Sequence, residues 1–362
     1  MEKYNLKIED IDYNKLLNRN PILVDNIKTY EYLKNKKILI SGGCGSIGSE
    51  IVKQLLNLEI NNLVIIDNSE CGTFELNNEV FEKYKNNNVK FHLVDILDSR
   101  RLNQIFNDEK PEIIYHCAAY KHVPIMEKNP WESIKVNIIG TKNIADISIK
   151  YKVEKFLMIS TDKAVNPTNV MGASKRVSEL YINNLNRQSD TQFITTRFGN
   201  VLGSSGSVIP TFIKQINKYK KIDITHKDII RYFMTIPEAA QLVLYASTIG
   251  KQGQILMFDM GEPVKIYDLA QNIIKNYTNN DIQINISGLR AGEKLYEELL
   301  CNGENTLETD NKYIKISKHK EEIDYDIFLN NYNELIETYK YLNQIEIKSK
   351  LKRLVPEYKI SY

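Results

Sequence analysis

Six short apolar runs, separated by longer segments of helical pattern, constrain the fold of this chain more than any other feature. Nearly continuous apolar runs are typical of strands buried on both faces, and such strands form parallel sheets that helices cover on either side. The alternation therefore predicts an α/β fold built on a doubly wound parallel sheet. The expected strands are Lys37–Ser41, Leu63–Asp67, Lys90–Asp95, Glu112–Cys117, Lys155–Ser160 and Gln192–Arg197.

The second half of the chain departs from this alternation. It has a glycine- and serine-rich stretch at Gly203–Ser207, a helical pattern that begins near Pro237, and short apolar segments around Phe258 and Ile284. A smaller region of this kind commonly closes over a ligand at the carboxyl ends of the strands. We expect an N-terminal extension (1–36), a sheet domain (37–200), a mainly substrate-binding region (201–300) and a tail (301–362) with helical spacing from Tyr325 to Leu354.

Composition excludes several classes of protein. A chain of 362 residues with 42% hydrophobic content can bury a full core, and 48 basic against 46 acidic residues leave no charge excess of the kind that binds nucleic acid. No window offers the roughly 18 apolar residues of a membrane span, and residues 1–35 lack the apolar core of a signal peptide. Widely spaced cysteines argue against a metal site or a disulfide framework, so we expect a soluble cytoplasmic protein without metal. They are Cys44, Cys71, Cys117 and Cys301.

A glycine-rich loop follows the first expected strand and opens a helix. Gly42, Gly45 and Gly48 have the spacing that lets a backbone turn tightly, approach a pyrophosphate and direct the helix N-terminus at its charge, with Ser46 and Ile47 between them. A plain strand-to-helix turn also accounts for the glycines. Asp67, however, ends the second strand about 20 residues further on, where an acid binds a ribose diol. Together these features predict a dinucleotide site on a Rossmann-type domain.

The surroundings of this site favour NAD over NADP. No Lys or Arg occurs from Asn68 to Thr73 to meet a 2′-phosphate. After the third strand, Asp95 and Ile96 are expected at the adenine edge, although an aspartate that caps the next helix is an equal alternative. After the fourth strand, Ala118 and Ala119 are small enough to let the cofactor pass close to the backbone.

The stretch from Ser160 to Arg176 follows the fifth strand, and Pro167 precedes or starts a helix that carries Lys175. Here the sequence resembles the extended short-chain dehydrogenase/reductase family. More narrowly, it resembles the catalytic domains of membrane-bound bacterial UDP-N-acetylglucosamine 4,6-dehydratases, without their membrane helices. The resemblance covers Ser41–Glu50, Ala118–Pro124, Ser160–Arg176, Arg197–Pro210, Arg231–Gln241 and Leu289–Leu299.

The resemblance implies a reaction in which NAD removes a hydride from C4 of the sugar, water leaves across C5 and C6, and the hydride returns to C6. It gives Asp162 the role of acid, Lys163 the role of base, and Lys175 a contact with the nicotinamide ribose. A lysine base must be neutral, so we expect burial or a positive neighbour such as Lys175 to lower the pKa of Lys163. The alternative is that Thr161 and Asp162 merely cap a turn while Lys163 is solvated.

One position departs from the wider family. Met171 stands where most short-chain dehydrogenases have the tyrosine of Tyr-x-x-x-Lys, and methionine cannot act as a base. The membrane-bound branch resembles this sequence in carrying methionine there. Thr161 is therefore the candidate to take the proton of the 4-hydroxyl, directly or through water.

Further residues are assigned to the substrate. By resemblance, Asn200, Arg231 and Arg290 contact its diphosphate, and Glu293 holds the nucleotide's ribose; arginine suits phosphate because it binds two oxygens at once. Lys121 and His122 are expected to reach the sugar, with a structural role as the alternative. Arg290-Ala291-Gly292-Glu293-Lys294 has alanine in place of the usual proline, which keeps the charges.

The expected function is conversion of UDP-N-acetylglucosamine to a UDP-4-keto-6-deoxy-N-acetylhexosamine for bacterial surface glycan synthesis. An NAD-dependent nucleotide-sugar epimerase, a GDP-sugar 4,6-dehydratase and a catalytically silent NAD-binding protein remain alternatives. Epimerases need no acid for a leaving hydroxyl, so Asp162 and Lys163 discriminate between the first two reactions. A homo-oligomer is expected, because helices beside Thr141–Lys150 and Arg176–Asn186 form dimer surfaces in related proteins.

Overall fold

A nine-stranded sheet forms the centre of the protein in the computed structural model, which describes residues 4–24, 26–84, 88–279, 281–298, 305–318 and 324–360. Its order is β14-β15-β11-β6-β5-β4-β1-β2-β3. Neighbours from β11 to β3 pair in parallel, whereas β15 and β14 are antiparallel additions at one edge. The strands are β1 (Lys37–Ser41), β2 (Asn62–Asp67), β3 (Val89–Leu93), β4 (Ile113–His116), β5 (Lys155–Thr161), β6 (Gln192–Phe198), β11 (Ile255–Phe258), β14 (Asn305–Glu308) and β15 (Ile314–Lys318).

This sheet confirms the predicted Rossmann-type fold. The six runs expected from the sequence are β1 to β6, with ends that differ by one or two residues. The chain winds outward in both directions from the middle, since β1 lies between β2 and β4. The chain therefore leaves β1 and β4 toward opposite faces of the sheet, and α/β proteins of this kind bind ligands at the carboxyl ends of the strands at such a point.

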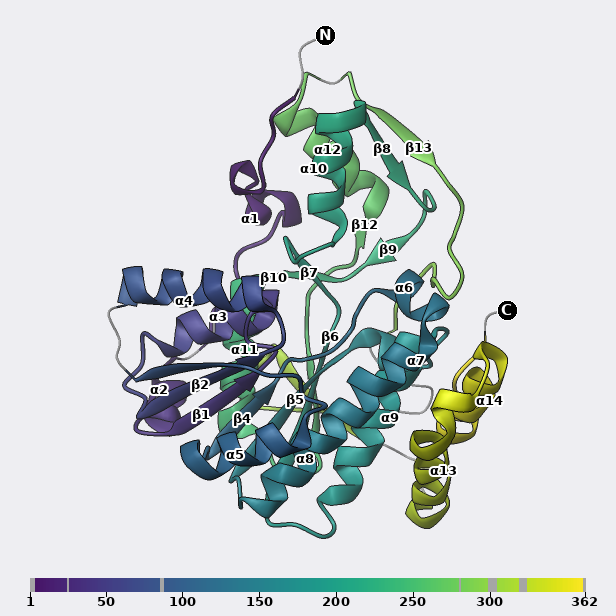
Figure 1. Ribbon diagram of the computed structural model, residues 1–362. Coiled ribbons are helices and arrows are strands. Elements are labelled where there is room, and N and C mark those ends of the chain that lie inside the picture. The colour runs from purple at the N-terminus through teal and green to yellow at the C-terminus, as the bar shows by residue number, and fades with distance from the viewer. Residues whose placement is uncertain are drawn as a thin grey trace.

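Helices cover both faces of the sheet, because alternate strand residues point to opposite sides. Leu39, Val64 and Phe156 face one core, whereas Ile38, Ile65 and Leu157 face the other. The first core is closed by α5 (Ser99–Glu109), the π-helical segment η2 (Ile134–Gly140), α8 (Thr141–Lys150) and α9 (Val170–Leu185). The second is closed by α2 (Asn26–Leu33), α3 (Ser46–Leu55), α4 (Glu70–Tyr84) and α11 (Ile236–Ile249), as Figure 1 shows.

The tail packs on the outer side of α9. It forms two helices, α13 (Tyr325–Thr338) and α14 (Gln344–Leu354), with the short turn η4 (Tyr339–Tyr341) between them. The helical run is interrupted there because Asn343 caps a new helix. Its side chain accepts hydrogen bonds from the backbone N–H groups of Ile345 and Glu346. Tyr332 of α13 stacks on Tyr181 of α9, with ring centroids 4.7 Å apart.

This packing corrects the expected dimer surface. All of α9 except Asn183 is buried, and the chain's own α13 and α14 occupy the outer side of that helix (Figure 1). The segment Arg176–Asn186 is therefore covered within one protomer and does not present that face to a second copy. The oligomeric state itself stays a prediction.

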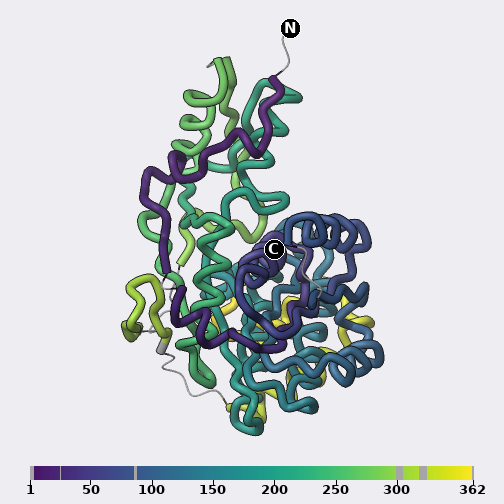
Figure 2. The backbone as a smooth tube through the Cα atoms, turned by 90° about the vertical axis from the view of Figure 1, so that its left-hand side faces the viewer, coloured from purple at the N-terminus to yellow at the C-terminus, as the bar shows by residue number. Residues whose placement is uncertain are grey.

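A smaller part stands on the carboxyl edge of the sheet and has its own core. The N-terminal extension belongs to it: η1 (Ile8–Asp10) packs on α10 (Val208–Tyr219), and α1 (Tyr13–Leu17) packs on α12 (Ile266–Tyr277). Figure 2 shows this segment running along the smaller part. Two elements of the 201–300 region, α11 and β11, return instead to the nine-stranded sheet. The other elements of this region are α10, α12, β7 (Asn200–Leu202), β8 (Lys221–Ile224), β9 (Ile230–Arg231), β10 (Phe233–Thr235), β12 (Val264–Lys265) and β13 (Gln283–Ile286). Three short helices lie in loops elsewhere in the chain: α6 (Val123–Lys128), α7 (Pro130–Ser133) and η3 (Asp162–Ala164).

Across the described ranges, no helix combines the length and the apolar composition needed to cross a bilayer. Cys44, Cys71 and Cys117 are free thiols, and Cys301 lies outside the described residues.

Candidate active site

The glycine-rich loop lies at the point where the strand order reverses. Gly42 has φ +67°, and a Cβ there would lie 2.6 Å from the backbone of Ala118, so only glycine allows this approach between the loops after β1 and β4. A Cβ on Gly48 would lie 2.3 Å from the Gly42 carbonyl oxygen. Gly45 precedes the first residue of α3, Ser46. The glycines therefore form a narrow backbone cradle at a helix N-terminus, as a dinucleotide pyrophosphate requires.

Asp67 stands beside this cradle at the end of β2. Its Oδ2 accepts a bond from Cys44 N at 2.9 Å, and its Oδ1 accepts one from Ser69 N at 2.9 Å. These bonds fix the carboxylate next to the loop, which fits recognition of a ribose diol. From the other side, Ser205 N donates to Ser46 Oγ at 3.1 Å, so the Gly203–Ser207 loop reaches over the start of α3.

The residues after β3 and β4, which we expect at the cofactor, differ in their contacts. Asp95 does not cap α5, since Asp98 does so by accepting from Arg101 N; Asp95 Oδ1 instead accepts from Leu97 N within the turn. Ile96 is buried against Gly140, where a Cβ would lie 2.3 Å from the isoleucine side chain. Ala118 and Ala119 are partly exposed. Apart from the capping alternative for Asp95, these cofactor assignments stay predictions.

A hydrogen-bonded triplet follows β5. Thr161 Oγ1 donates to Asp162 Oδ1 at 2.8 Å, and Lys163 Nζ donates to the same oxygen at 2.9 Å and to Asn200 Oδ1 at 3.2 Å. Thr161 Oγ1 also accepts from Lys163 N at 3.4 Å, so the capping part of the simpler interpretation is correct. The solvated lysine is not, because the Lys163 side chain is only 17% exposed.

The electrostatics of Lys163 contradict one expectation. Burial, together with Arg231, would lower the pKa of Lys163. The carboxylates of Asp162 and Glu297 outweigh both effects, so the pKa is raised. Glu297 Oε1 lies 3.6 Å from Lys163 Nζ. The expected lowering was wrong because two carboxylates from different parts of the chain surround the ammonium group. The cation that opposes the rise is Arg231.

Helix α9 packs tightly on the triplet. A Cβ on Gly172 would lie 2.1 Å from the Lys163 carbonyl oxygen, which explains glycine in this turn. Lys175 is buried, and burial lowers its pKa to about 8 against the opposing effects of Glu179 and Cys117. Met171 is also buried. Helix α9, which packs on the candidate base Lys163, thus carries a second lysine, Lys175, whose pKa is lowered.

The residues assigned to the substrate come from several loops. Arg231 is largely enclosed: its Nη1 donates to Ile230 O and its Nη2 to Lys294 O, both at 2.7 Å. Glu293 accepts from Thr225 Oγ1 at 3.0 Å and from Arg290 N at 3.1 Å, whereas the Arg290 residue is exposed. In this arrangement Arg231 braces the 290–298 segment, so it is not an open cationic contact.

Lys121 and His122 lie under the Gly203–Ser207 loop. Lys121 Nζ donates to Ser204 Oγ at 3.3 Å, and a Cβ on Gly206 would lie 2.5 Å from the His122 ring. Burial lowers the pKa of both side chains, and Lys121 adds to the lowering at His122. Their contact with a sugar stays a prediction.

Sequence reasoning assigned no role to Glu297, which is buried beside Lys163. Its segment, 290–298, packs on the stretch after the triplet: Lys294 Nζ donates to Val165 O at 3.0 Å, and Thr168 Oγ1 donates to Gly292 O at 2.9 Å. The pair Glu297-Glu298 lies in the segment that carries the family resemblance, and this was the available signal. Which of the two glutamates faces inward depends on the fold of the loop.

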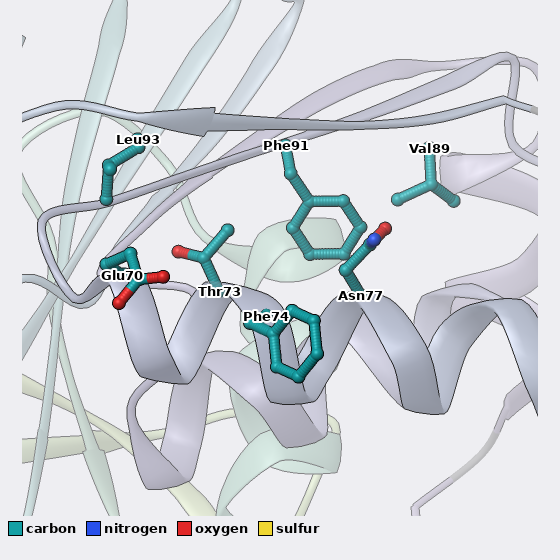
Figure 3. A pocket seen from close by; sticks show the side chains of 7 residues that line it. All are labelled: Glu70, Thr73, Phe74, Asn77, Val89, Phe91 and Leu93. Carbon is teal, nitrogen blue, oxygen red and sulfur yellow. The ribbon is translucent and has the colours of Figure 1, made fainter.

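A hollow of about 450 Å³ lies elsewhere, between α4 and the edge strand β3 (Figure 3). Both apolar and polar side chains line it, and none of the candidate residues above is among them. The lining residues are Glu70, Thr73, Phe74, Asn77, Val89, Phe91 and Leu93.

Comparisons with known proteins show which proteins this chain resembles. A family model described as polysaccharide biosynthesis protein matches residues 38–319. The chain is 45% identical to the capsular polysaccharide biosynthesis protein CapD of Staphylococcus aureus over 88% of this chain and 53% of that protein. The chain thus spans about half the length of that relative.

Two enzymes of different activity are also similar. The chain is 35% identical to a UDP-N-acetylglucosamine 4,6-dehydratase (inverting) of Campylobacter jejuni over 77% of this chain and 82% of that protein. It is 34% identical to a UDP-glucose 4-epimerase of Rickettsia bellii over 75% and 79%, respectively. Among solved structures, Pen from Bacillus thuringiensis superposes with a TM-score of 0.75 at 34% identity, covering 82% of this chain and 90% of that one.

Proposed function

This chain belongs to the polysaccharide biosynthesis protein family of nucleotide-sugar dehydratases and epimerases, and from that membership we propose that it is an NAD-dependent UDP-N-acetylglucosamine 4,6-dehydratase. The product would be a UDP-4-keto-6-deoxy-N-acetylhexosamine for surface glycan synthesis in the cytoplasm. The observation that carries the proposal is the bonded triplet of Thr161, Asp162 and Lys163. An elimination needs both a base and an acid at neighbouring sugar carbons, and this triplet supplies both groups.

The chemistry of the bound cofactor is hydride removal from C4 and hydride return to C6. Thr161 Oγ1 takes the proton of the 4-hydroxyl and, through its 2.8 Å bond, passes a proton to Asp162 Oδ1. Lys163 Nζ removes the C5 proton, and Asp162 protonates the departing 6-hydroxyl, which leaves as water. Lys163 then returns a proton to C5. The proton that Asp162 gives to the departing 6-hydroxyl is thus made good by the proton that it received from the 4-hydroxyl.

The remaining candidates bind and orient. Lys175 holds the nicotinamide ribose and, with a pKa of about 8, keeps positive charge near the 4-hydroxyl at neutral pH. Asn200 joins the substrate's diphosphate site to the triplet through its bond to Lys163. Arg290 is the exposed cation for that diphosphate, and Arg231 holds in place the 290–298 segment that carries it.

The cofactor is NAD, held by the glycine cradle and Asp67. The Asp67 carboxylate is fixed beside the loop, and a 2′-phosphate would meet it without a cation from residues 68–73 to offset the repulsion. We expect calorimetry to give at least tenfold weaker binding of NADP than of NAD, equivalent to about 1.4 kcal/mol. Equal affinities would remove this assignment.

The function is tested by incubating the protein and NAD with a panel of UDP- and GDP-linked sugars and analysing products by mass spectrometry. Loss of water from UDP-N-acetylglucosamine is the expected result. Loss of water only from a GDP-sugar would correct the nucleotide. A product of unchanged mass but altered C4 configuration would support the epimerase instead, a reaction that similarity to the Rickettsia enzyme keeps in view. Binding of NAD without turnover of any sugar would favour a silent binding protein.

A further inference from the structure

Glu297 is a buried carboxylate that the reaction outlined above does not use. Its side chain is 3% exposed, its Oε1 lies 3.6 Å from Lys163 Nζ and 3.4 Å from Arg231 Nε, and its Oε2 has no hydrogen-bond partner among the described residues. A buried carboxylate without full hydrogen bonding is costly, so its charge needs compensation from those two cations.

Lys163 and Asp162 share a proton that has two possible positions. When it is on Lys163, the pair is an ammonium and a carboxylate; when it moves 2.9 Å from Nζ to Asp162 Oδ1, the pair is an amine and a carboxylic acid. No other bond changes, and no proton enters or leaves. The proposed C5 deprotonation needs the second arrangement, which holds a free base beside a loaded acid. In the reaction the pair reaches it when Lys163 gives its proton to solvent and Asp162 takes the proton of the 4-hydroxyl from Thr161. Asp162 Oδ2 is buried and has no hydrogen-bond partner among the described residues.

Glu297 acts against this transfer. We propose that Glu297 is a positioning residue for the candidate base: its carboxylate fixes Lys163 Nζ between Asp162 and Asn200 and keeps the shared proton on that nitrogen in the substrate-free protein. The catalytic part of this inference rests on the proposed function, whereas the position of the proton does not.

The charged groups around Lys163 support this balance. Asp162 and Glu297 favour the ammonium, and Arg231 and burial oppose it, with the net effect that the pKa of Lys163 is raised. Glu293 lies 3.7 Å from Arg231, and Lys294 Nζ donates to Val165 O and to Glu298. Removing the Glu297 charge therefore leaves Lys163 with one carboxylate and one opposing guanidinium.

Glu297→Gln tests the inference, because glutamine keeps the shape and removes the charge. An opposite charge within about 4 Å commonly shifts a pKa by one to three units, so the pH at which Lys163 loses its proton should fall by about that amount. The measurement is competitive acetylation of the substrate-free protein across a pH series, with the extent of Lys163 labelling read by mass spectrometry. It requires neither substrate nor turnover.

Glu298→Gln is the matched control. Glu298 is the next residue on the same segment, but it pairs with Lys294 at 2.9 Å and does not contact Lys163. Its loss should leave the Lys163 midpoint in place. An unchanged midpoint in Glu297→Gln, or equal shifts in both variants, would overturn the proposal. If Glu297→Gln does not fold, Glu297→Asp decides instead: it withdraws the carboxylate by one methylene, and its midpoint must still lie below that of the wild type.

A second readout separates this inference from the proposed function. Once C4 is oxidised, the pH profile of deuterium entry at C5 should move to lower pH in Glu297→Gln, because less alkali is needed to free the amine. A purely structural role would lower the rate at every pH without moving the midpoint. If the labelling midpoint moves while no C5 exchange occurs in any variant, the inference on Glu297 stands and the dehydratase proposal fails.

Discussion

Lys163→Ala should accumulate NADH without dehydrating the sugar. In the proposed reaction, C4 oxidation precedes C5 deprotonation, so removing the base leaves the first step intact and stops the second. With UDP-N-acetylglucosamine and NAD, absorbance of NADH should appear and persist, while deuterium from heavy water fails to enter C5. The overall rate should fall on the order of a hundredfold or more, as for the loss of a general base.

Two further variants locate the other steps in the same assay. Asp162→Asn keeps an oxygen that accepts from Thr161 and Lys163, but it can neither take the proton from Thr161 nor protonate the 6-hydroxyl. It should form NADH more slowly than the wild type, still exchange C5, and lose water slowly. Thr161→Val removes the hydroxyl that takes the 4-hydroxyl proton. It should slow NADH formation at least tenfold, about 1.4 kcal/mol of barrier.

Met171→Ala is the control for this series, because methionine carries no transferable proton and measurable turnover should remain. Exchange at C5 must follow Lys163. Wild-type exchange in Lys163→Ala, or normal dehydration in both Lys163→Ala and Asp162→Asn, would refute the assignment of acid and base. The epimerase and the silent binding protein would then regain support.

Glu179→Ala should destabilise the protein by about 3–5 kcal/mol, the usual cost of breaking a buried ion pair. The Glu179 carboxylate lies between Arg197, with Nη2 at 2.7 Å from Oε2, and Arg176, with Nη1 at 3.1 Å from the same oxygen. Ser160 Oγ donates to Oε1 at 2.6 Å. Its removal leaves both buried guanidinium groups without their shared carboxylate, and urea unfolding at pH 7 measures the loss.

The stabilisation by Glu179 should depend on pH, and the pKa of its carboxyl group gives the direction. Burial would raise the pKa of Glu179, but Arg197 and Arg176 outweigh it and lower the pKa to about 2. A depressed pKa stabilises the folded state above the ordinary value near 4.5, and this contribution is lost as the pH falls toward 2. The gap in unfolding free energy between wild type and Glu179→Ala should therefore narrow between pH 4.5 and the lowest pH at which folding persists.

Glu357→Gln provides the comparison, because Glu357 pairs with Arg176 at 2.9 Å but its side chain is 25% exposed. Partly exposed pairs contribute about 0–1 kcal/mol, so this variant should be close to wild type at every pH. Similar losses in both variants would show that the buried position of Glu179 is not what matters.

The parts of the protein that depend on local pattern were predictable from the sequence. Buried strands need apolar residues at nearly every position, so β1 to β6 were visible as runs. A pyrophosphate cradle needs glycines where a Cβ would collide, and Gly42 and Gly48 lie at such positions. Asp67 and the triplet from Thr161 to Lys163 follow strand ends directly, so strand position alone brought them to the same edge of the sheet.

The tertiary structure decided what depends on residues distant in sequence. The sequence alone does not reveal that Glu297 faces Lys163 while its neighbour Glu298 faces Lys294, since both are glutamates on one loop and only the path of that loop separates them. The pKa of Lys163 was misjudged partly for this reason: burial lowers it, but the adjacent Asp162 and, about 130 residues away in the chain, Glu297 together raise it. The covering of α9 by the tail is likewise a property of packing, because an apolar helix face does not specify whether its partner is the same chain or a second copy.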